Sequence, residues 1–485
     1  MVSDIMAGSR VPAFHVRFNA QNAEQGPAIQ TYRALIAGGR LLAGEVDELV
    51  PKRATSADEV GRMFGRGSVV HRMAIGWFEN NRRTEAWFVG LDDPAGSNAA
   101  SRTVTIAGAP TTSGTVFLYV AGTRLQVGAK TTDTPTTIGD AVVSAIAADD
   151  TLPVSAVNAA GTVTLTAKNK GELGNDVDVR VNYFPGEELP AGLTVTIGAM
   201  SGGTGAPDLD NLWAILGDEQ YHVVAIPYTD AANLSSLDAE LADRWGPERQ
   251  IEGFATTAKA GTHSELTTFG DGQNSKHLAC LGLAKPLTSI EQTAGALGAV
   301  VAAEGQADPA RHFRTVELKG VRAPEFVDRF TVAEQDLLLR DGVATFEVDA
   351  GGTLRIQRLV TMHQENEAGA ASTAFLDATT PLTLSFLRFD TRNRFGTKYP
   401  RYKLADDGTR AGAGQPIMTP SLAKAEMLDL FFGWQELGLV EGYEQFKRDL
   451  EVTRDPQDPN RLNFLVSPDL VNGFLVGAAD FTFLV

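Results

Sequence analysis

The residue types that most often do chemistry are present in this chain, but their spacing does not assemble a reactive site. Cys280 is the single cysteine, which excludes an intramolecular disulfide and a cysteine-based zinc site. Its neighbours Leu278, Ala279 and Leu281 favour a small buried side chain over a reactive thiol. No G-x-S-x-G motif occurs, and Ser68 in the stretch GRGSV has the pattern of a turn before a helix. We therefore expect no catalytic residue.

The histidines and glycines do not match a metal or phosphate site either. The chain has seven histidines, scattered and without an HExxH motif or a short ligand pair; they include His71, His263, His277, His312 and His363. This scatter favours solvated or hydrogen-bonded side chains over metal ligands. There is no G-x-x-x-x-G-K-[ST] motif, and for GALGAVVAAEG we expect neither a preceding strand nor a downstream ribose-binding carboxylate. The sequence predicts no metal and no cofactor.

The charged residues exclude one class of partner and leave another open. The net charge of -18 disfavours nucleic acid, because affinity for phosphates comes from basic surfaces that release counterions. The carboxylate pairs Asp92-Asp93 and Asp406-Asp407 lie beside proline or glycine, where turn formation explains them without acid–base catalysis. One basic cluster stands out, and its members are Arg392, Arg394, Lys398, Arg401 and Lys403. It is either a solvated face or an interface to an acidic partner.

Length and composition indicate a globular protein of several domains. At 485 residues the chain is long enough for about two to four domains, and 43% hydrophobic residues are enough to build buried cores. The amino terminus MVSDIMAGSRVP has an early acid and no apolar core, unlike a secretory signal. No run reaches the roughly 20 apolar residues that span a bilayer. We expect assembly in a cytoplasm, without membrane insertion.

The clearest local signals lie in the stretch 308–361. Thr331 and Glu334 have the spacing of a capping box, and the helix that follows should end at Gly342. The residues 349–352 then have the composition of a hairpin turn. The return strand alternates apolar and polar residues, which is typical of a half-buried strand.

The order of elements predicts an α/β (α+β) multidomain fold. We expect an N-terminal arm and tether at 1–27, an α/β core domain at 28–98 plus 206–365, an inserted β-rich outer domain at 99–205, and a C-terminal α+β domain at 366–485. The insert is indicated by its Thr-, Val-, Gly- and Ala-rich composition and its flexible exit SGGTG. Such an insertion requires that its two ends lie close together.

In the C-terminal part, Thr380-Pro381 and Thr419-Pro420 each have the pattern of a helix cap followed by proline. The second of these helices should place five apolar side chains on one face, which are Ala423, Met427, Leu430, Trp434 and Leu437.

Both chain ends alternate apolar and polar residues, which predicts a strand at each end. The apolar positions are Phe14, Val16 and Phe18 near the start, and Phe481, Phe483 and Val485 in a last strand over 473–485. Neither strand has a hairpin partner within turn distance, so its backbone groups must find a sheet edge elsewhere. We expect both arms to pair with sheets of neighbouring subunits and to be mobile in a free subunit.

Four stretches carry a resemblance to a known family. They are SRVPAFHVRF, DEVGRMFGRGSVVHRMAIGWFENN, VDRFTVAEQDLLLRDGVATFEVDAGGTLRIQRLVTMH and DPNRLNFLVSPDLVNGFLVGAADFTFLV. Together they resemble the tail sheath proteins of contractile bacteriophages, especially the Mu-like ones, and of related contractile injection systems. The resemblance covers most of the chain outside the insert.

This resemblance implies a virion structural protein that polymerises as helical stacked hexameric rings around a tail tube. Such a sheath contracts to drive the tube through the target cell envelope during genome ejection. The implied partners are further copies of the chain, the tail tube protein, and the baseplate and tail terminator proteins, with assembly in the host bacterial cytoplasm. The basic cluster then supplies candidate tube-facing or interface charges. We expect the insert on the outer surface, removable without loss of polymerisation.

Two other classes of function stay open. A subtilisin-like fold name is attached to part of the family, but the chain has no Ser/His/Asp signature that supports hydrolysis. A carbohydrate-binding or adhesive module in the β-rich insert would show an aromatic-lined groove. Phe117, Tyr119, Tyr183 and Phe184 are candidates for it, although core or hairpin positions explain them equally well.

Overall fold

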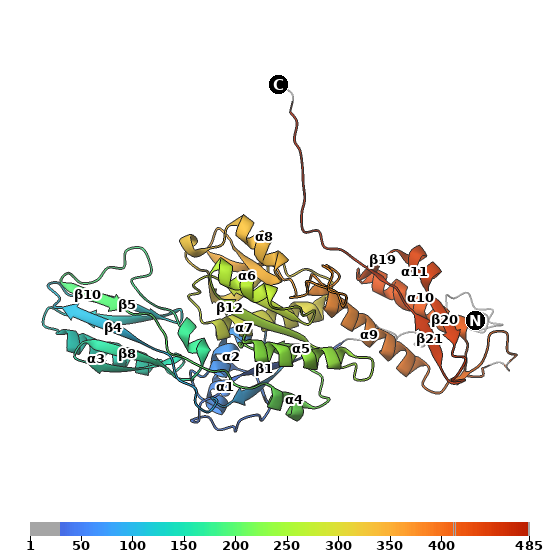
Figure 1. Ribbon diagram of the computed structural model, residues 1–485, viewed down its shortest axis with the longest axis horizontal. Helices are drawn as coiled ribbons and strands as arrows, with labels where there is room; N and C mark the ends of the chain where they lie inside the picture. The colour runs from blue at the N-terminus through green and yellow to red at the C-terminus, as the bar shows by residue number, and fades with distance from the viewer. Residues whose placement is uncertain (1–29, 411, 413, 484–485) are drawn as a thin grey trace, which may run out of the picture. The chain divides into compact units, whose positions relative to one another are not determined.

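The computed structural model describes residues 30–410, 412 and 414–483. Contacts between residues divide the chain into two compact units (Figure 1). The α/β unit contains Thr31–Ser385 and the segment that starts at Val471, and the C-terminal unit contains Phe386–Leu470. Helices and several sheets occur together, which confirms the predicted α/β (α+β) class.

A nine-stranded sheet forms the middle of the α/β unit, with the order β14-β16-β15-β13-β12-β11-β1-β3-β2. Its strands are β1 (Arg33–Gly39), β2 (Lys52–Ala54), β3 (Glu85–Leu91), β11 (Val223–Ala225), β12 (Phe254–Ala260), β13 (Leu278–Leu283), β14 (Glu317–Arg322), β15 (Val343–Val348) and β16 (Thr353–Arg358). The central strands run parallel, whereas β2, β14 and β16 pair antiparallel. The apolar runs of β1 and β13 are typical of buried parallel strands.

Helices cover both faces of this sheet. Alternate residues of a strand point to opposite faces, and in β1 Ala34 and Ile36 pack under α1 (Ala57–Phe64), α2 (Val69–Asn80) and α7 (Ile290–Ala307). Leu35 and Ala37 pack under α4 (Asp210–Leu216) and α5 (Ala231–Trp245) on the other face. Two further helices of this unit, α6 (His263–Asp271) and α8 (Val332–Arg340), meet each other in a smaller cluster.

Glycines allow α2 and α7 to pack with their backbones in contact. A Cβ on Gly76 would lie 2.1 Å from the Gln292 carbonyl oxygen, and one on Gly295 would lie 2.1 Å from that of Met73. Our expectation that no strand precedes GALGAVVAAEG was wrong, because β13 ends at Leu283 and α7 follows. Gly295 in this stretch therefore serves close packing of the two helices, which a side chain at this position would prevent.

The local signals of the central stretch are confirmed. Thr331 Oγ1 accepts a hydrogen bond from Glu334 N (3.3 Å), and Glu334 Oε2 accepts one from Thr331 N (2.7 Å). Helix α8 ends before Gly342, whose φ of 73° is the left-handed conformation that glycine adopts easily. Strands β15 and β16 then form the expected antiparallel hairpin, in which Asp349 accepts hydrogen bonds from the turn backbone.

The residues between β3 and α4 form two antiparallel sheets, β10-β4-β8-β7 and β6-β5-β9, with their own hydrophobic core. The elements are β4 (Ser101–Gly108), β5 (Gly114–Val120), β6 (Thr123–Ala129), α3 (Pro135–Ala148), β7 (Val154–Ala159), β8 (Thr162–Ala167), a 3-10 turn at Glu172–Asp176, β9 (Val179–Val181) and β10 (Leu193–Ile197). The chain enters and leaves at adjacent points, since Asn98 N donates to Thr204 O (3.3 Å). We call this region the insert.

Hydrogen bonds between side chains and backbone fasten the insert to the α/β layer. Arg72, on the buried side of α2, donates from Nη2 to Ala121 O of the insert (3.2 Å) and to Gln292 Oε1 of α7 (2.6 Å). Asn169 Nδ2 donates to Arg40 O (2.8 Å) at the end of β1. The insert is therefore docked on the layer as well as connected through its two chain ends.

The C-terminal unit is a small α+β assembly. Its helices are α9 (Thr379–Lys398, with its residues from Phe386 in this unit), α10 (Pro420–Glu436) and α11 (Tyr443–Asp449), and its strands are β17 (Lys403–Leu404), β18 (Ile417–Met418), β19 (Val440–Glu441), β20 (Glu451–Arg454), β21 (Leu462–Leu465) and β22 (Asp469–Leu470). The Thr419 cap is confirmed. Four of the five predicted apolar positions of α10 are buried, but Leu437 is 48% exposed because it caps a helix that has already ended.

Candidate assembly surfaces

The residues with reactive side chains are held in unreactive environments. Cys280 is fully buried in β13, and burial raises the pKa of its thiol to about 12. Burial lowers the pKa of His71 to about 4, and its Nδ1 accepts a hydrogen bond from Gly67 N (2.9 Å). Ser68 caps α2, as expected, with its Oγ accepting from His71 N (3.2 Å). At neutral pH this thiol is protonated and this imidazole neutral.

Three further histidines and the paired carboxylates contribute to structure. Aromatic rings lie against His263, His277 and His363. Arg40 donates a hydrogen bond to Asp92, and Asn169 and Lys170 donate to Asp93. Arg454 donates to Asp406, and Ser421 donates to Asp407. Among the described residues no three His, Cys, Asp or Glu side chains gather as metal ligands. No helix within the described residues has the length and apolarity needed to cross a membrane.

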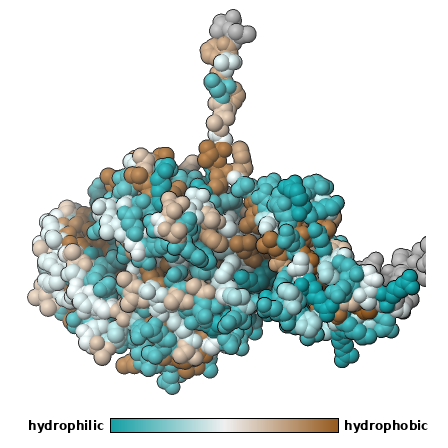
Figure 2. Space-filling model, turned by 45° about the vertical axis from the view of Figure 1, so that its right-hand side comes forward, coloured by the Kyte–Doolittle hydropathy of each residue, from teal (hydrophilic) through white to brown (hydrophobic). Residues whose placement is uncertain are grey.

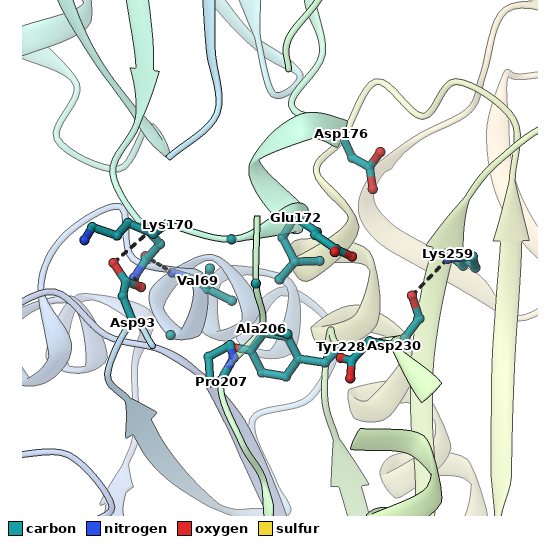
Figure 3. Close-up of a pocket in the computed structure, with 16 residues that line it drawn as sticks. Val69, Asp93, Lys170, Glu172, Asp176, Ala206, Pro207, Tyr228, Asp230 and Lys259 are labelled. Atoms are coloured by element: carbon teal, nitrogen blue, oxygen red, sulfur yellow. Dashed lines mark hydrogen bonds between the residues drawn. The ribbon is translucent and has the colours of Figure 1, made fainter. Parts of the chain in front are cut away.

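A small cavity lies where the insert meets the carboxyl ends of β1 and β11 (Figure 3). Asp93 and Lys170 lie on one side of it, and Asp230 and Lys259 on the other. Asp93 accepts a hydrogen bond from Lys170 N (2.9 Å), and Lys259 Nζ donates to Thr229 Oγ1 (3.1 Å). The cavity volume is about 80 Å³, whereas ligand pockets usually have roughly 300–1,000 Å³. This space suits a few water molecules at the seam of the insert.

Two members of the basic cluster, Arg394 and Lys398, are part of the C-terminal unit's own framework. Lys398 Nζ lies 2.7 Å and Arg394 Nη1 2.9 Å from Glu426 Oε1, while the Tyr399 hydroxyl donates to Glu426 Oε2. Burial raises the pKa of Glu426, but these hydrogen bonds outweigh burial and hold the pKa below its ordinary value. These contacts join α9 to α10, so Arg394 and Lys398 are engaged within the subunit.

The remaining three members of the cluster, Arg392, Arg401 and Lys403, have exposed side chains. Lys403 Nζ donates to Gln415 Oε1 (3.1 Å), a neutral partner. The structure therefore separates the cluster into two cations bound to Glu426 and three cations on the surface.

Strands β20 and β21 form a two-stranded antiparallel hairpin in the C-terminal unit (Figure 1). Within the described residues, each strand has one paired edge and one open edge. Phe464 is 39% and Leu465 57% exposed on β21. Open edges with apolar side chains beside them are templates for pairing with another strand. Nothing in the spacing of the residues indicated that this hairpin would have two open edges.

The C-terminal segment, residues 471–483, has no secondary structure. Most of its large apolar side chains are exposed, with Phe474 at 87%, Val476 at 84%, Phe481 at 89% and Phe483 at 85%. Figure 2 shows hydrophobic residues at intervals along this segment. The strand expected over 473–485 is thus absent from its described residues, because a strand requires hydrogen bonds to a neighbouring edge.

Four of the predicted arm residues lie outside the described part of the chain. They are Phe14, Val16, Phe18 and Val485. The pairing of both arms with neighbouring subunits stays a prediction.

Comparisons with known proteins identify the family of the chain. The model of the phage tail sheath protein central domain matches residues 202–362, and that of the phage tail sheath C-terminal domain matches residues 370–482. The chain is 36% identical over 483 residues to the Mu-like prophage FluMu tail sheath protein of Haemophilus influenzae, covering 100% of this chain and 99% of the relative.

Solved sheath structures are also similar to this chain. The sheath tail protein of Desulfitobacterium hafniense is 12% identical with a TM-score of 0.48, over 95% of this chain and 100% of that one. The helical sheath of the anti-feeding prophage in its contracted state is 10% identical with a TM-score of 0.49, over 98% of this chain and 99% of that one. The full-length identity to a tail sheath protein and the two domain models show that the chain belongs to the phage tail sheath protein family.

Proposed function

We propose that this protein polymerises as helical stacked hexameric rings around a tail tube and contracts to drive the tube through a target cell envelope during genome ejection. It is a structural protein of a contractile tail sheath, and the sheath is a component of the virion tail. The observation that carries the finer proposal is the exposed apolar C-terminal segment, which has no partner strand among the described residues of its own chain.

The C-terminal segment and the β20–β21 hairpin each offer what the other lacks, which is a partner for unpaired backbone groups and for exposed apolar side chains. The segment offers unpaired backbone groups and exposed Phe481 and Phe483, and the hairpin offers open edges beside Phe464 and Leu465. Addition of a strand to an exposed edge is a general mode of recognition, in which main-chain hydrogen bonds give affinity and alternate side chains give specificity. We assign the hairpin of one subunit as the acceptor for the C-terminal arm of another.

The energetics favour pairing in an array over pairing in isolation. A ten-residue arm gains about 0.5–1.5 kcal/mol for each of about ten hydrogen bonds, and about 1.5–3 kcal/mol for each large apolar side chain buried. Ordering it costs about 1–2 kcal/mol per residue. These terms nearly cancel, so one arm alone is marginal. In a lattice, neighbouring subunits supply the edge at high effective concentration, and each subunit is held by more than one arm.

A truncation tests this assignment directly. Removal of the residues after Gly477 should leave a folded subunit with a nearly unchanged melting temperature, because the removed residues that the structure describes are exposed. Negative-stain electron microscopy should show tubes for the full chain and none for the truncated chain. Tubes of normal appearance from the truncated chain would rule out the arm, and an unfolded truncated subunit would show that the arm belongs to its own core.

The surface cations give a second proposed contact. Arg401 and Lys403 are exposed and belong to the expected tube-facing cluster, so we place them against an acidic surface of the tail tube protein. Replacing both with glutamate should weaken co-sedimentation of the sheath with assembled tubes, and more strongly at low than at high salt. Unchanged co-sedimentation at low salt would remove these residues from the tube interface. We also propose that the sheath contacts the baseplate and tail terminator proteins and that it assembles in the host bacterial cytoplasm.

We further propose that the protein has no catalytic activity and no bound metal or cofactor. In the described residues Cys280 is buried, Ser68 caps a helix, and the small cavity at the insert holds no nucleophile paired with a base. Labelling of a serine by a fluorophosphonate probe, or a stoichiometric metal found by mass spectrometry, would contradict this.

One observation favours a second candidate, an adhesive role of the insert. Tyr183 and Phe184 line a hollow of about 760 Å³ between the insert and β14, together with Arg124, Gln292 and Glu317. Aromatic rings beside planar polar side chains are what sugar recognition requires. Against it, Phe184 packs edge-on against Tyr183 at 5.0 Å. Binding of oligosaccharides by the wild type that is lost in Phe184→Ala would support adhesion, and no binding by the wild type would dismiss it.

A further inference from the structure

The base of the C-terminal segment is seated on the α/β unit, although its tip is exposed. Arg314 Nη1 donates a hydrogen bond to Leu475 O (2.8 Å). Gly473 lies directly on the His312 ring, since a Cβ at this position would lie 2.0 Å from His312 Cδ2. The contacts of the chain accordingly assign the residues from Val471 to the α/β unit. We call these two contacts, of His312 with Gly473 and of Arg314 with Leu475, the seat.

The loop that provides this seat is itself held rigidly. Phe313, between the two contact residues, is 3% exposed and belongs to the core of the unit. Thr315 N donates to Ile356 O (2.8 Å), and Arg355 Nη1 donates to Thr315 O (3.0 Å), so β16 fixes the loop from one side.

Other groups of the α/β unit enclose the His312 ring. Its Nδ1 lies 3.9 Å from Asp377 Oδ1, and Asp377 accepts two hydrogen bonds of 2.9 Å each from Arg358. Only 17% of the His312 side chain is exposed. An enclosed ring has little room to turn aside, so a residue larger than glycine would collide with it where the segment crosses.

We propose that His312 and Arg314 are positioning residues that fix the base of the C-terminal arm to the α/β unit, so that the free arm starts after Gly477. The seat is a feature of the single subunit. The consequence for assembly rests on the proposed function: another copy then receives an arm whose origin and direction are already set. Ordering part of a binding segment in advance lowers the entropic cost of association.

The seat also determines how motion is transmitted between the α/β unit and the arm. Leu470, the last residue of β22, belongs to the C-terminal unit, whereas Val471 and the residues after it belong to the α/β unit. With the seat formed, a force on the arm acts on the loop that carries His312 and Arg314. A movement of the α/β unit therefore displaces the arm, and through it the neighbouring subunit.

Limited proteolysis of the full-length free subunit tests the seat. Chymotrypsin can cut after Phe474 within the seated part and after Phe481 within the free part, and both rings are exposed. Cleavage requires an extended, mobile backbone, and its rate tracks the population of the open form. We expect cleavage after Phe481 to be about tenfold faster, the factor that corresponds to one hydrogen bond of about 1.4 kcal/mol. Equal rates at the two sites would overturn the proposal.

Matched variants identify the residues. Arg314→Ala should bring the rate after Phe474 close to that after Phe481, whereas Arg311→Ala, an exposed arginine of the same loop, should change neither rate. Gly473→Ala should act like Arg314→Ala because its methyl group collides with His312. The double variant His312→Ala/Gly473→Ala makes room for that methyl group and should restore protection after Phe474. If the Arg314→Ala variant is cleaved after Phe474 at the same rate as the wild type, the proposal is overturned.

Assembly is measured separately, so that the two proposals can fail independently. Arg314→Ala retains both terminal arms and should still form tubes, but its critical concentration should rise several-fold because the arm is no longer set in advance. Equal critical concentrations for this variant and the wild type overturn the positioning role. If the wild type forms no tubes at all, the proposed function fails, while the proteolysis result still decides whether the seat exists.

Discussion

The insert and the C-terminal segment are both additions to the α/β layer, yet they differ in whether their backbone hydrogen-bonding groups and apolar side chains find partners. The insert pairs its strands in two sheets, buries its apolar residues in its own core, and docks through hydrogen bonds such as that of Arg72 with Ala121. The segment exposes Phe481 and Phe483 almost completely, and its described residues form no strand. The insert is complete within the subunit, whereas we propose that the segment is completed by a partner.

This difference separates subunit stability from assembly. Substitutions in the insert should change the free energy of unfolding of the free subunit, because its contacts exist there. Substitutions in the free part of the segment should change association alone. The following predictions test that division, in order of the expected effect on subunit stability.

The largest effect is expected at Arg72, which is 3% exposed between the insert and α7. Arg72→Ala removes the donor to Ala121 O and Gln292 Oε1 and leaves Glu291, 4% exposed, without its nearby cation. Breaking one side of a buried charged contact costs about 3–5 kcal/mol. Urea unfolding followed by circular dichroism should show this loss in the first transition. The exposed Arg83→Ala is the control and should change stability by less than about 0.5 kcal/mol.

The contact of Arg72 with the insert also affects the stability of a chain from which the insert has been removed. Replacing residues 99–205 with a short Gly/Ser bridge is geometrically simple, since Asn98 and Thr204 are hydrogen-bonded neighbours. It would, however, uncover Arg72 and the loop around Gly67, which now contacts the insert backbone at Leu152. We retain the prediction that the shortened chain forms tubes, but expect its subunit to be less stable. A folded shortened subunit that forms no tubes would show that the insert takes part in the lattice.

A somewhat smaller effect is expected in the core of the insert. Leu165, on β8, is fully buried. Leu165→Ala should destabilise the insert by about 2–5 kcal/mol through lost burial and a residual cavity. Val157 on the adjacent β7 is 69% exposed and provides the control, since Val157→Ala removes little buried surface. Thermal unfolding should separate the two variants by several degrees. Equal melting temperatures would mean that the insert does not fold as a cooperative part of the subunit.

The sequence predicted the features that depend on neighbouring residues. The capping box of Thr331 and Glu334, the cap at Thr419 and the hairpin after Gly342 were correctly located because each is determined within a few positions. It did not reveal that Glu426 engages Arg394 and Lys398, because the partners lie on another helix and only packing of α9 against α10 brings them together. Arg72 and the seat at Gly473 were missed for the same reason. Contacts distant in sequence leave no pattern in the spacing of residues.

An intermediate effect is expected at Glu426, whose carboxylate is 6% exposed and joins α9 to α10. Glu426→Gln leaves the partly exposed Arg394 and Lys398 without their anion, which should cost about 1–3 kcal/mol at neutral pH. Glu436→Gln, at the exposed end of α10, is the control and should cost much less. Equal losses for the two variants would mean that the Glu426 contacts do not hold the unit together.

The effect of Glu426 should depend on pH in a definite direction. Hydrogen bonds lower the pKa of this carboxyl below its ordinary value of 4.5. A group with a depressed folded pKa stabilises fully above its unfolded pKa and loses that contribution as pH falls through the folded pKa. The stability difference between wild type and Glu426→Gln should therefore be constant near neutrality and shrink below about pH 4.5. A difference that grows on acidification would show that the carboxyl is stabilised in its protonated form.

The smallest effect on the subunit, and the sharpest test of the division, is expected at the tip of the C-terminal segment. Phe481 and Phe483 are 89% and 85% exposed, so the double variant Phe481→Asp/Phe483→Asp removes almost no contact of the free subunit. Its melting temperature should match that of the wild type within about one degree, since surface substitutions usually cost less than about 0.5 kcal/mol. Assembly should nevertheless be lost, because burying unpaired carboxylates against a neighbouring sheet is strongly unfavourable. Val157→Asp is the matched control, a comparable change on the exposed face of the insert, and should still form tubes. If the double variant melts much earlier than the wild type, the segment is part of its own subunit's fold; if it forms tubes as readily as the control, these two rings do not enter the contact between subunits.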